Sequence, residues 1–373
     1  MLKGFYLTLL MGPKVPIPAP QPVIDALTDA QVTTSARGAS GFQLTFALSK
    51  KSVINTLMLP AGAFDPGIRV ILVATVNSLP IVLMDGIITQ HSVTPSNEPG
   101  QSKLSVTGQD LTVLMGLAHI WKPFPSLPSD GITALLLLGY IIYGFIPLII
   151  PPLQVDIDVL TEKWRSQTSS DLELINHMAD DVGYVFYLEP GPVPGTNIAY
   201  FGPEIRVGIP QPALNVDMDA ETNVESLSFT YDGMARDQPT LVILDPITGK
   251  IPIPIPIPDV NLLRPPLALR PAQSMRTLPI DGVANLGPIR AAMLGLARAS
   301  TPDLITGSGQ LDVLRYGRPL KARQLVGVRG AGAAYDGLYY VSSVTHNIKR
   351  GEYKQSFRLA REGLISLTPA VVP

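Results

Sequence analysis

The sequence contains no cysteine. Disulfide bonds, zinc sites built on thiolates and catalysis by a thiol nucleophile are therefore excluded together. Histidine is also scarce, and none of the 4 histidines has a second histidine at the spacing of a metal site. They are His91, His119, His177 and His346. We expect neither a metal ion nor any other cofactor.

The sequence also lacks a large excess of positive or of negative charge. Lys and Arg number 28 and Asp and Glu number 30, which gives a formal net charge of −2. Proteins that bind nucleic acid usually carry a basic excess, so we do not expect nucleic acid as the main ligand. Hydrophobic residues make up 46% of the 373 positions, which is enough to bury a large core in two or three domains.

Acidic and glycine-rich segments do not combine into a catalytic site. Glu173, Asp180 and Asp181 fall on the polar face and at the end of an amphipathic helix, where solvated charges are ordinary. The glycine-rich stretches at 307–309 and 327–337 lack the strand-to-helix context of a phosphate loop, and we interpret both as turns. The sequence does not predict an enzyme.

Basic side chains gather in one stretch towards the end of the chain, at Arg315, Arg318, Lys321, Arg323 and Arg329. One interpretation is a solvated strand face. The other is a contact with an acidic partner or the lining of a lumen, because charge patches usually tune association and not the fold. The sequence leaves both interpretations open.

Alternation of apolar and polar residues predicts an antiparallel β domain over residues 29–116. The segments at 41–48 and 102–108 alternate, and the segment at 68–76 is rich in β-branched residues. The strand pattern returns at 224–229 and 323–359, with a helix expected near 288–298.

A helical period appears between these two β regions. Ser170 and Glu173 form a capping-box pattern, and Gly183 can close the helix. The expected apolar stripe consists of Leu172, Ile175, Ala179 and Val182. A strand-like "YVFYL" follows, so we predict a small α/β element in the middle of the chain.

One strand-like segment occurs twice. "MDGIITQHSVT" at 84–94 and "YDGLYYVSSVT" at 335–345 share Asp-Gly and Ser-Val-Thr without a gap. We interpret the pair as a duplication that produces two similar β-barrels, although hairpins often reuse Asp-Gly and a chance similarity stays open. Each copy is expected to form a hairpin, the first with residues 103–107 and the second with residues 353–359.

The Asp-Gly pairs mark the structural corners of this repeat, which are Asp85 and Gly86 in the first copy and Asp336 and Gly337 in the second. Glycine adopts positive φ easily, so we expect each strand to begin at a turn or bulge formed there. Replacing either glycine should then strain the backbone.

An uncharged run, "ITALLLLGYIIYGFIPLII", covers residues 132–150. Its length is near the lower limit of a membrane-spanning helix, but it contains Pro147 and lacks basic residues at both ends. We predict a buried or interface helix that begins at Ser129 or Asp130 and breaks before Pro147, with Leu136 and Ile142 as candidate interface residues. The alternative is a membrane-associated β protein anchored through residues 132–150.

The chain is rich in proline, with 37 residues, and "KIPIPIPIPDV" at 250–260 places proline at every second position. Such a pattern disfavours a central strand and favours an extended, polyproline-like arm. Its row of isoleucines would be unfavourable in water, so we expect a partner surface to cover them. These candidate interface residues are Ile251, Ile253, Ile255 and Ile257.

Three parts of the sequence resemble baseplate hub proteins of contractile phage tails and injection systems. They are the opening "GFYLTLLMGPKVPIPAP" with "GFQLTFALSK", the unit "SSDLELINHMADDVGYVFYLEPG", and the closing run from "TGSGQLDVLRYG" to "FRLAREG". The similar families are the late control D proteins of phages and the N-terminal hub part of type VI spike proteins. The apolar segments near 121–153 and 241–272 lie outside the resemblance.

The resemblance implies a mainly β fold with an α/β middle element, in which two similar tube-protein-like β-barrels are joined by a small α/β domain. The first hub barrel would span residues 1–116, the apolar insert and α/β domain 117–215, and the second hub barrel 216–373 with a Pro-rich insert at about 241–272. The resemblance also implies a homotrimer whose pseudo-sixfold ring joins the hexameric inner tube to a trimeric spike.

Further partners follow from the same resemblance. The sequence lacks the C-terminal needle of fused spike proteins, so a separate spike protein is expected, together with baseplate wedge or LysM-type adaptor proteins. The implied setting is assembly in the bacterial cytoplasm into a phage tail baseplate or an injection particle, with a membrane contact not expected. The sequence does not distinguish a phage tail from an extracellular or membrane-anchored injection system.

Overall fold

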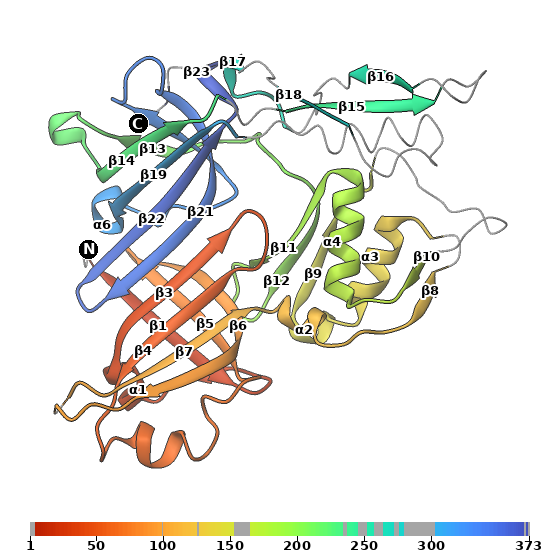
Figure 1. Ribbon diagram of the computed structural model, residues 1–373. Helices are drawn as coiled ribbons and strands as arrows, with labels where there is room; N and C mark the ends of the chain where they lie inside the picture. The colour runs from red at the N-terminus through yellow and green to blue at the C-terminus, as the bar shows by residue number, and fades with distance from the viewer. Residues whose placement is uncertain are drawn as a thin grey trace.

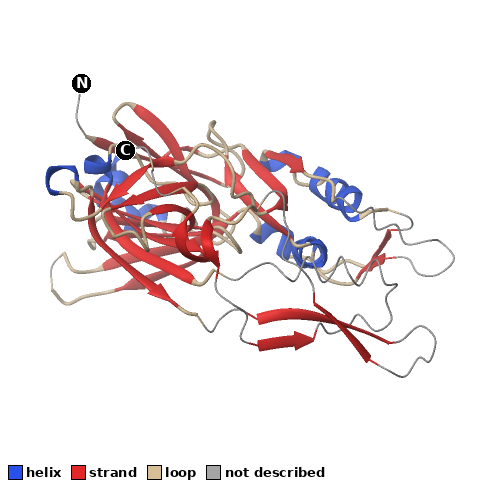
Figure 2. Cartoon of the chain, turned by 90° about the horizontal axis from the view of Figure 1, so that it is seen from above, coloured by secondary structure: helices blue, strands red, loops and turns tan. Residues whose placement is uncertain are grey.

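The computed structural model describes residues 4–98, 100–124, 127–152, 165–233, 237–244, 252–256, 264–271, 276–279, 303–368 and 371 (Figure 1). The protein is mainly β, with one large sheet that is almost entirely antiparallel and four small sheets among the described residues. The large sheet occupies one side of the molecule, and the longer helices lie on the other (Figure 2).

The N-terminal unit contributes seven strands to the large sheet. These are β1 (Phe5–Gly12), β2 (Ile17–Pro18), β3 (Leu27–Ser35), β4 (Gly41–Ala47), β5 (Arg69–Val76), β6 (Leu79–Thr94) and β7 (Lys103–Asp110). Helix α1 (Gln21–Ala26) and the π-helical turn η1 (Ile54–Met58) lie in its loops. The alternation predicted at 41–48 is confirmed, because Phe42, Leu44 and Phe46 all enter the core from β4.

The middle of the chain forms a small α/β unit. Its helices are α2 (Val113–Gly116), α3 (Ser129–Leu138), the 3-10 turn η2 (Ile141–Tyr143) and α4 (Asp171–Val182). Its strands are β8 (Lys122–Phe124), β9 (Phe145–Ile149), β10 (Arg165–Gln167), β11 (Tyr184–Pro190) and β12 (Asn197–Pro203). β11, β12 and β9 form one sheet in that order, and β8 pairs with β10.

Helix α4 begins and ends as the sequence predicts. Ser170 accepts a hydrogen bond from the Glu173 N–H while the Glu173 carboxylate accepts one from the Ser170 N–H, and Gly183 closes the helix at φ +71°. The buried face differs in part from the expected stripe, because Leu174 and Met178 are buried together with Ile175 and Ala179.

The C-terminal unit completes the large sheet. Its elements are β13 (Gln211–Asn215), the 3-10 turn η3 (Asp219–Glu221), β14 (Val224–Tyr231), β19 (Ile305–Asp312), α6 (Val313–Tyr316), β20 (Leu325–Arg329), β21 (Gly337–Lys349) and β22 (Glu352–Arg361). β17 (Ala268–Pro271) pairs with β23 (Gly363–Ser366). β13 pairs with β20, so the structure places residues 211–215 with this unit and not with the middle part.

The two units repeat the same arrangement of strands. In the first, the order in space is β3-β4-β7-β6-β5, and in the second it is β14-β19-β22-β21-β20. Every neighbouring pair is antiparallel, and the chain visits the strands in the same sequence in both. Both expected hairpins are present, as β6–β7 and β21–β22. The repeated segment is therefore part of a five-strand repeat and not an isolated similarity.

A direct strand pairing joins the two units. β3 lies antiparallel against the C-terminal half of β21, from Ser343 opposite Ser35 to Lys349 opposite Asp29 (Figure 1). One hydrophobic core runs through both units, and it includes Val32 of β3 and Val344 of β21. The two halves of the repeat thus form one continuous sheet.

The apolar run at 132–150 is not one helix, which corrects the predicted break before Pro147. Helix α3 begins at Ser129 as expected but ends at Leu138, and the remainder forms η2 and the strand β9. Gly144 ends the 3-10 turn at φ +86° and lets the chain enter the sheet. Pro147 fits β9 because, among the described residues, this strand lies at an edge and pairs with β12 alone.

The proline-rich segment is a paired strand where it is described, which corrects the expected polyproline-like arm. β16 (Pro252–Pro256) pairs antiparallel with β15 (Asp237–Leu244), and β15 also pairs with β18 (Arg276–Pro279). β16 lies at the edge of this small sheet, where a proline without an N–H is tolerated. Ile253 and Ile255 lie in β16, whereas Ile251, Ile257 and the helix expected near 288–298 fall outside the described residues.

Candidate functional site

The histidine and carboxylate side chains considered as catalytic candidates do not gather into one site among the described residues. In the part of the chain that the structure describes, no three His, Asp or Glu side chains are placed to hold a metal ion. On α4, His177 faces Asp181 at 3.3 Å, and His119 lies 3.5 Å from Glu173, with the His177, His119 and Glu173 side chains largely exposed. Such contacts are typical of solvated helix surfaces.

The Gly-Ser-Gly stretch lies inside β19, so its interpretation as a turn is wrong. A Cβ at Gly307 would lie 2.9 Å from the Phe229 ring, and one at Gly309 would lie 2.6 Å from the Phe357 ring. These glycines leave room for aromatic packing across the sheet. The second glycine-rich stretch does contain a turn, between β20 and β21.

Asp85 binds an arginine in the interior and does not form a corner. Its carboxylate accepts two hydrogen bonds from Arg69, at 2.7 and 2.6 Å, and one from Asn197 at 2.8 Å. Arg69 also donates to the carbonyls of Tyr143 and Gly195 in the α/β unit. We call Arg69, Asp85 and Asn197 the polar clasp, because they fasten the α/β unit to the N-terminal unit.

Gly86 follows within β6, so the predicted positive φ at this position is wrong. It lies between Val70 of β5 and Asp110 of β7. A Cβ there would come within 2.2 Å of the Gln109 carbonyl oxygen. Close approach of neighbouring strands, and not a turn, accounts for glycine at this site.

Gly337 has the backbone that the sequence suggested for both corners. It begins β21 at φ +110°, and a Cβ would lie 2.1 Å from the Ser366 Cβ. The preceding turn is held by Asp336, whose carboxylate accepts the Ala331 N–H at 2.8 Å. The buried Arg361 donates to the Asp336 carbonyl at 3.0 Å and lies over the Tyr339 ring.

Arg323 lies buried where the three units meet. The interpretation of the basic stretch as a solvated strand face is therefore wrong for this residue. Its guanidinium lies 3.8 Å from the centre of the Tyr187 ring and donates to the Ser35 carbonyl at 2.7 Å. Burial lowers the pKa of this guanidinium below its usual value. Arg323 therefore connects the α/β unit to the junction between the two repeats.

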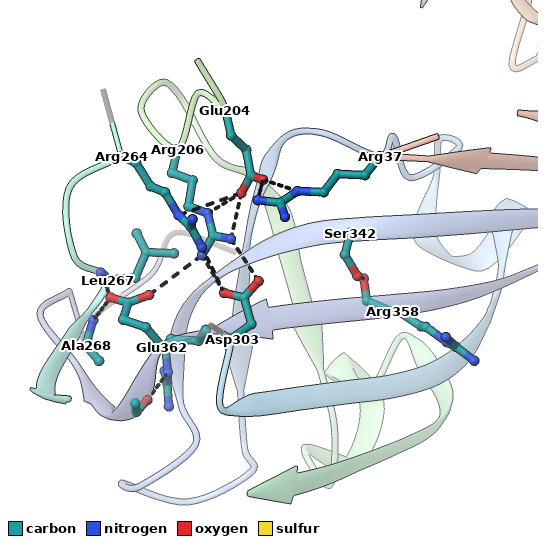
Figure 3. Close-up of polar contacts among 12 residues, drawn as sticks. Arg37, Glu204, Arg206, Arg264, Leu267, Ala268, Asp303, Ser342, Arg358 and Glu362 are labelled. Carbon is teal, nitrogen blue, oxygen red and sulfur yellow. Dashed lines mark hydrogen bonds and ion pairs between the residues drawn. The ribbon is translucent and has the colours of Figure 1, made fainter. Parts of the chain in front are cut away.

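A group of six charged residues forms a second connection, which we call the charge cluster (Figure 3). It consists of Arg37, Glu204, Arg206, Arg264, Asp303 and Glu362. These residues come from the loop after β3, the segment after β12, the segment before β17, the approach to β19 and the end of β22. The cluster therefore ties together four distant segments of the chain and the β3–β4 loop of the first repeat.

Arg206 is the centre of the charge cluster. It donates to Asp303 through two bonds of 2.7 and 2.9 Å and to Glu204 through one of 2.7 Å. Burial of the Glu204 carboxyl opposes ionisation, but the guanidinium groups around it outweigh this effect and lower its pKa below the usual value. Three arginines face three carboxylates, so the charges of the cluster balance, although the Arg37 side chain is largely exposed.

His346 gives the second repeat a dependence on pH. Its ring lies in the core and contacts the Tyr353 hydroxyl at 2.7 Å, and burial lowers its pKa to about 4. His346 is therefore neutral in the folded protein down to about pH 4. In the unfolded chain its imidazole gains a proton as the pH falls below about 6.5, which favours unfolding. We expect this group to remove about 1 kcal/mol of stability per pH unit between pH 6.5 and 4.

The measurement is denaturant unfolding at several pH values for the parent protein and for His346→Gln. The variant should lose stability less steeply over this range. His177→Gln, on the exposed face of α4, is the matched control and should follow the parent curve. Equal slopes for all three proteins would contradict the role given to His346.

Exposed apolar side chains are concentrated in one stretch of the α/β unit, from the end of α3 through η2 to β9. It is formed by Leu138, Ile141, Ile142, Ile146 and Leu148, each about half exposed or more, which we call the apolar edge. Ile146 and Leu148 project from β9, whose second edge has no partner strand among the described residues. Several exposed apolar side chains close together in a chain commonly mark a site of contact with another protein.

The two candidate interface residues of this segment have different environments. Leu136 is 7% exposed and belongs to the core of the α/β unit, so it is not available to a partner. Ile142 is 82% exposed and lies in the apolar edge. Within the described residues, no helix has the length and apolar character needed to cross a membrane.

Comparison with known proteins adds evidence on the fold. No protein-family model matches the sequence, and no curated protein matches it. Among solved structures, a tail protein from Neisseria meningitidis is 15% identical, with a TM-score of 0.61 over 97% of this chain and 98% of its own. A 43 kDa tail protein from a Shewanella oneidensis prophage is 14% identical, with a TM-score of 0.62 over 96% and 99%.

A third similar structure comes from a secretion machine. It is an E. coli component of the type VI secretion system, described as similar to T4 bacteriophage tail proteins. It is 12% identical to this chain, with a TM-score of 0.54 over 93% of this chain and 77% of its own. The chain therefore has a fold that phage tail proteins and a type VI secretion component share.

Proposed function

We propose that this protein is a structural hub of a phage tail or a contractile injection machine and not an enzyme. In this proposal, three chains form a ring that joins a hexameric inner tube on one side to a trimeric spike on the other. The spike would be a separate polypeptide, and wedge or LysM-type adaptor proteins would bind around the ring. Assembly would take place in the bacterial cytoplasm.

The observation that carries the proposal is the five-strand repeat. Two units with the same strand order in one chain give three chains six similar units, which match a tube ring of six subunits. The similarity of fold to phage tail proteins and to a type VI secretion component supports the same class of role. The two repeats are proposed to act as the two tube-like barrels.

The direct test is the mass of the assembled protein. Native mass spectrometry or sedimentation of the purified chain should give three copies, and electron microscopy of the assembly should show a ring with near-sixfold symmetry. A stable dimer or hexamer would contradict the proposal. So would a ring that does not bind the hexameric tube protein of the same particle.

The apolar edge is proposed to be covered by a partner in the particle. Ile142→Asp should leave the free energy of unfolding within about 0.5 kcal/mol of the parent, because its side chain is exposed. It should nevertheless reduce incorporation into particles, measured by quantifying the chain in purified tails. Leu136→Asp is the contrasting variant and should cost about 3 kcal/mol or more, since it buries an unpaired carboxylate.

Normal incorporation of Ile142→Asp would show that the apolar edge stays uncovered. Normal incorporation accompanied by loss of membrane association would favour a membrane-anchored protein instead.

A further inference from the structure

A small cavity lies beside the buried Arg323. Its volume is about 270 Å³. Two segments line it, one after β12 and one at the start of β20, and the lining residues are Ile205, Val207, Gly208, Ile209, Arg323, Gln324 and Leu325. Pockets for small-molecule ligands usually measure about 300–1,000 Å³, so this cavity suits a single side chain better than a cofactor.

Arg323 carries a buried positive charge that makes no salt bridge within the described residues. Its terminal nitrogens donate to the carbonyls of Ser35 and Leu188, at 2.7 and 3.4 Å. Each of these nitrogens has a second N–H, and Nε is buried without any acceptor. Glu189 and Asp110 act on the charge from a distance, but neither forms a salt bridge with it. A carboxylate brought into the cavity would therefore stabilise this cation.

Arg323 differs in this respect from the other arginines that are buried in the described part of the chain, which are Arg69, Arg206 and Arg361. In each of those three, Nε donates to an oxygen acceptor. The backbone of Arg323 is also unusual, because its φ of +65° lies in the left-handed region that long side chains rarely adopt. Residues held in such conformations are often found at functional sites.

The opposite wall of the cavity presents apolar side chains. Burial alternates along this segment, because Glu204 and Arg206 belong to the charge cluster (Figure 3), whereas Ile205 and Val207 are 36% and 47% exposed. Ile209 follows and is 94% exposed. From Ile205 to Ile209, no backbone hydrogen bond is found within the described residues. The segment thus offers apolar side chains together with free N–H and C=O groups, as an edge does that accepts a further strand.

We propose that this cavity is a docking site for an extended, acidic segment of a partner protein. An Asp or Glu side chain of the partner enters the cavity and pairs with Arg323, and apolar side chains of the same segment cover Ile205, Val207 and Ile209. A contact with an acidic partner is one of the two interpretations that the sequence left open for the basic stretch.

The chemistry of the site determines the kind of partner. A guanidinium recognises a carboxylate through its planar set of N–H groups. A nucleic acid would need several basic contacts to its phosphates, whereas the rim of this cavity is apolar. The inference goes beyond the proposed ring, because a single folded chain contains the whole site.

The test is the binding of short peptides to the purified full-length chain, followed by the anisotropy of an uncharged fluorophore. Two probes, Ile-Ser-Glu-Ser-Ile and Ile-Ser-Asp-Ser-Ile, cover two side-chain lengths, and Ile-Ser-Gln-Ser-Ile is the uncharged match. Both ends of each peptide are blocked, so the side chain is the only carboxylate. At least one acidic probe should bind about tenfold more tightly than the Gln peptide, or better.

Variants of the chain locate the binding site. Arg323→Gln should weaken binding of the acidic probe about tenfold or more. Because Arg323 also contacts Ser35 and Tyr187, its loss can affect folding, so Ile209→Asp is the second variant. It changes an exposed side chain and places a like charge at the cavity, and it should also weaken binding about tenfold. Ile142→Asp, which is 82% exposed in the apolar edge, is the matched control and should bind as the parent does.

Three outcomes would overturn the docking site. Equal affinities of the acidic and Gln peptides would exclude recognition of a carboxylate, and unchanged binding in Ile209→Asp would exclude this location. Binding of inorganic phosphate without binding of either acidic peptide would replace the partner protein with a free anion. None of these measurements depends on how many chains assemble, so the docking site and the hub proposal can fail separately.

Discussion

Asp85→Ala is expected to lower the free energy of unfolding by about 3–5 kcal/mol. The substitution leaves Arg69 buried without the carboxylate that accepts its two shortest hydrogen bonds. Asn197 loses an acceptor at the same time. Because these residues form the polar clasp, the α/β unit should also become easier to cleave by protease. Denaturant unfolding and limited proteolysis measure the two effects.

The control for Asp85 is an ion pair at the surface. Glu225→Ala removes the carboxylate 2.9 Å from Lys354, in a pair that is about one-third exposed, and should leave the unfolding midpoint close to that of the parent. The double variant Arg69→Met with Asp85→Leu removes both buried charges and should recover much of the stability. A loss below about 1 kcal/mol in Asp85→Ala would show that the clasp does not fasten the units.

Gly337→Val should destabilise the second repeat by about 3 kcal/mol or more. Two effects act together, because a side chain is strained at φ +110° and its Cβ would overlap Ser366. The Ser366 hydroxyl also accepts the Leu338 N–H, so displacing it disturbs the start of β21. Thermal unfolding should show a lower melting temperature.

Variants of two other glycines distinguish backbone strain from steric crowding, the two effects expected at Gly337. Gly332 has φ +93°, and no atom lies within 4 Å of the place that a Cβ would take, so Gly332→Ala should cost only about 1 kcal/mol of backbone strain. Gly86 lacks the positive φ, but a Cβ there would lie 2.2 Å from the Gln109 carbonyl oxygen, so Gly86→Ala tests crowding alone. An unchanged melting temperature in Gly337→Val would refute the strained corner.

Local patterns in the sequence were sufficient for several of the strands and for helix α4. Alternation located β4 and β7, richness in β-branched residues located β5, and the Ser170–Glu173 capping box located the start of α4, because these signals depend on neighbours in the chain. The Ser-Val-Thr repeat pointed to the two hairpins. It did not reveal that β3 would pair with β21, since that contact joins residues more than half the chain apart.

The buried polar connections were the main omission. Arg206, Glu204 and Asp303 carry no local signal, because a charged residue in a loop is ordinarily solvated. Asp85 was recognised only as part of a turn, although its partners are Arg69 and Asn197 from other segments. The proline-rich strand β16 was misjudged because only the fold provides a neighbour at one of its edges.

The pairing of β3 with β21 also has a consequence for how assembly depends on concentration. If the six units were separate molecules, the concentration of rings would rise as the sixth power of the free concentration of units. For the proposed ring of three chains, it would rise as the third power of the free concentration of chains. In the proposed ring, half of the contacts between units would already be made when each chain folds, at a high local concentration set by the covalent link. The proposed ring of three chains would therefore form at levels of protein so dilute that unlinked units would remain dispersed.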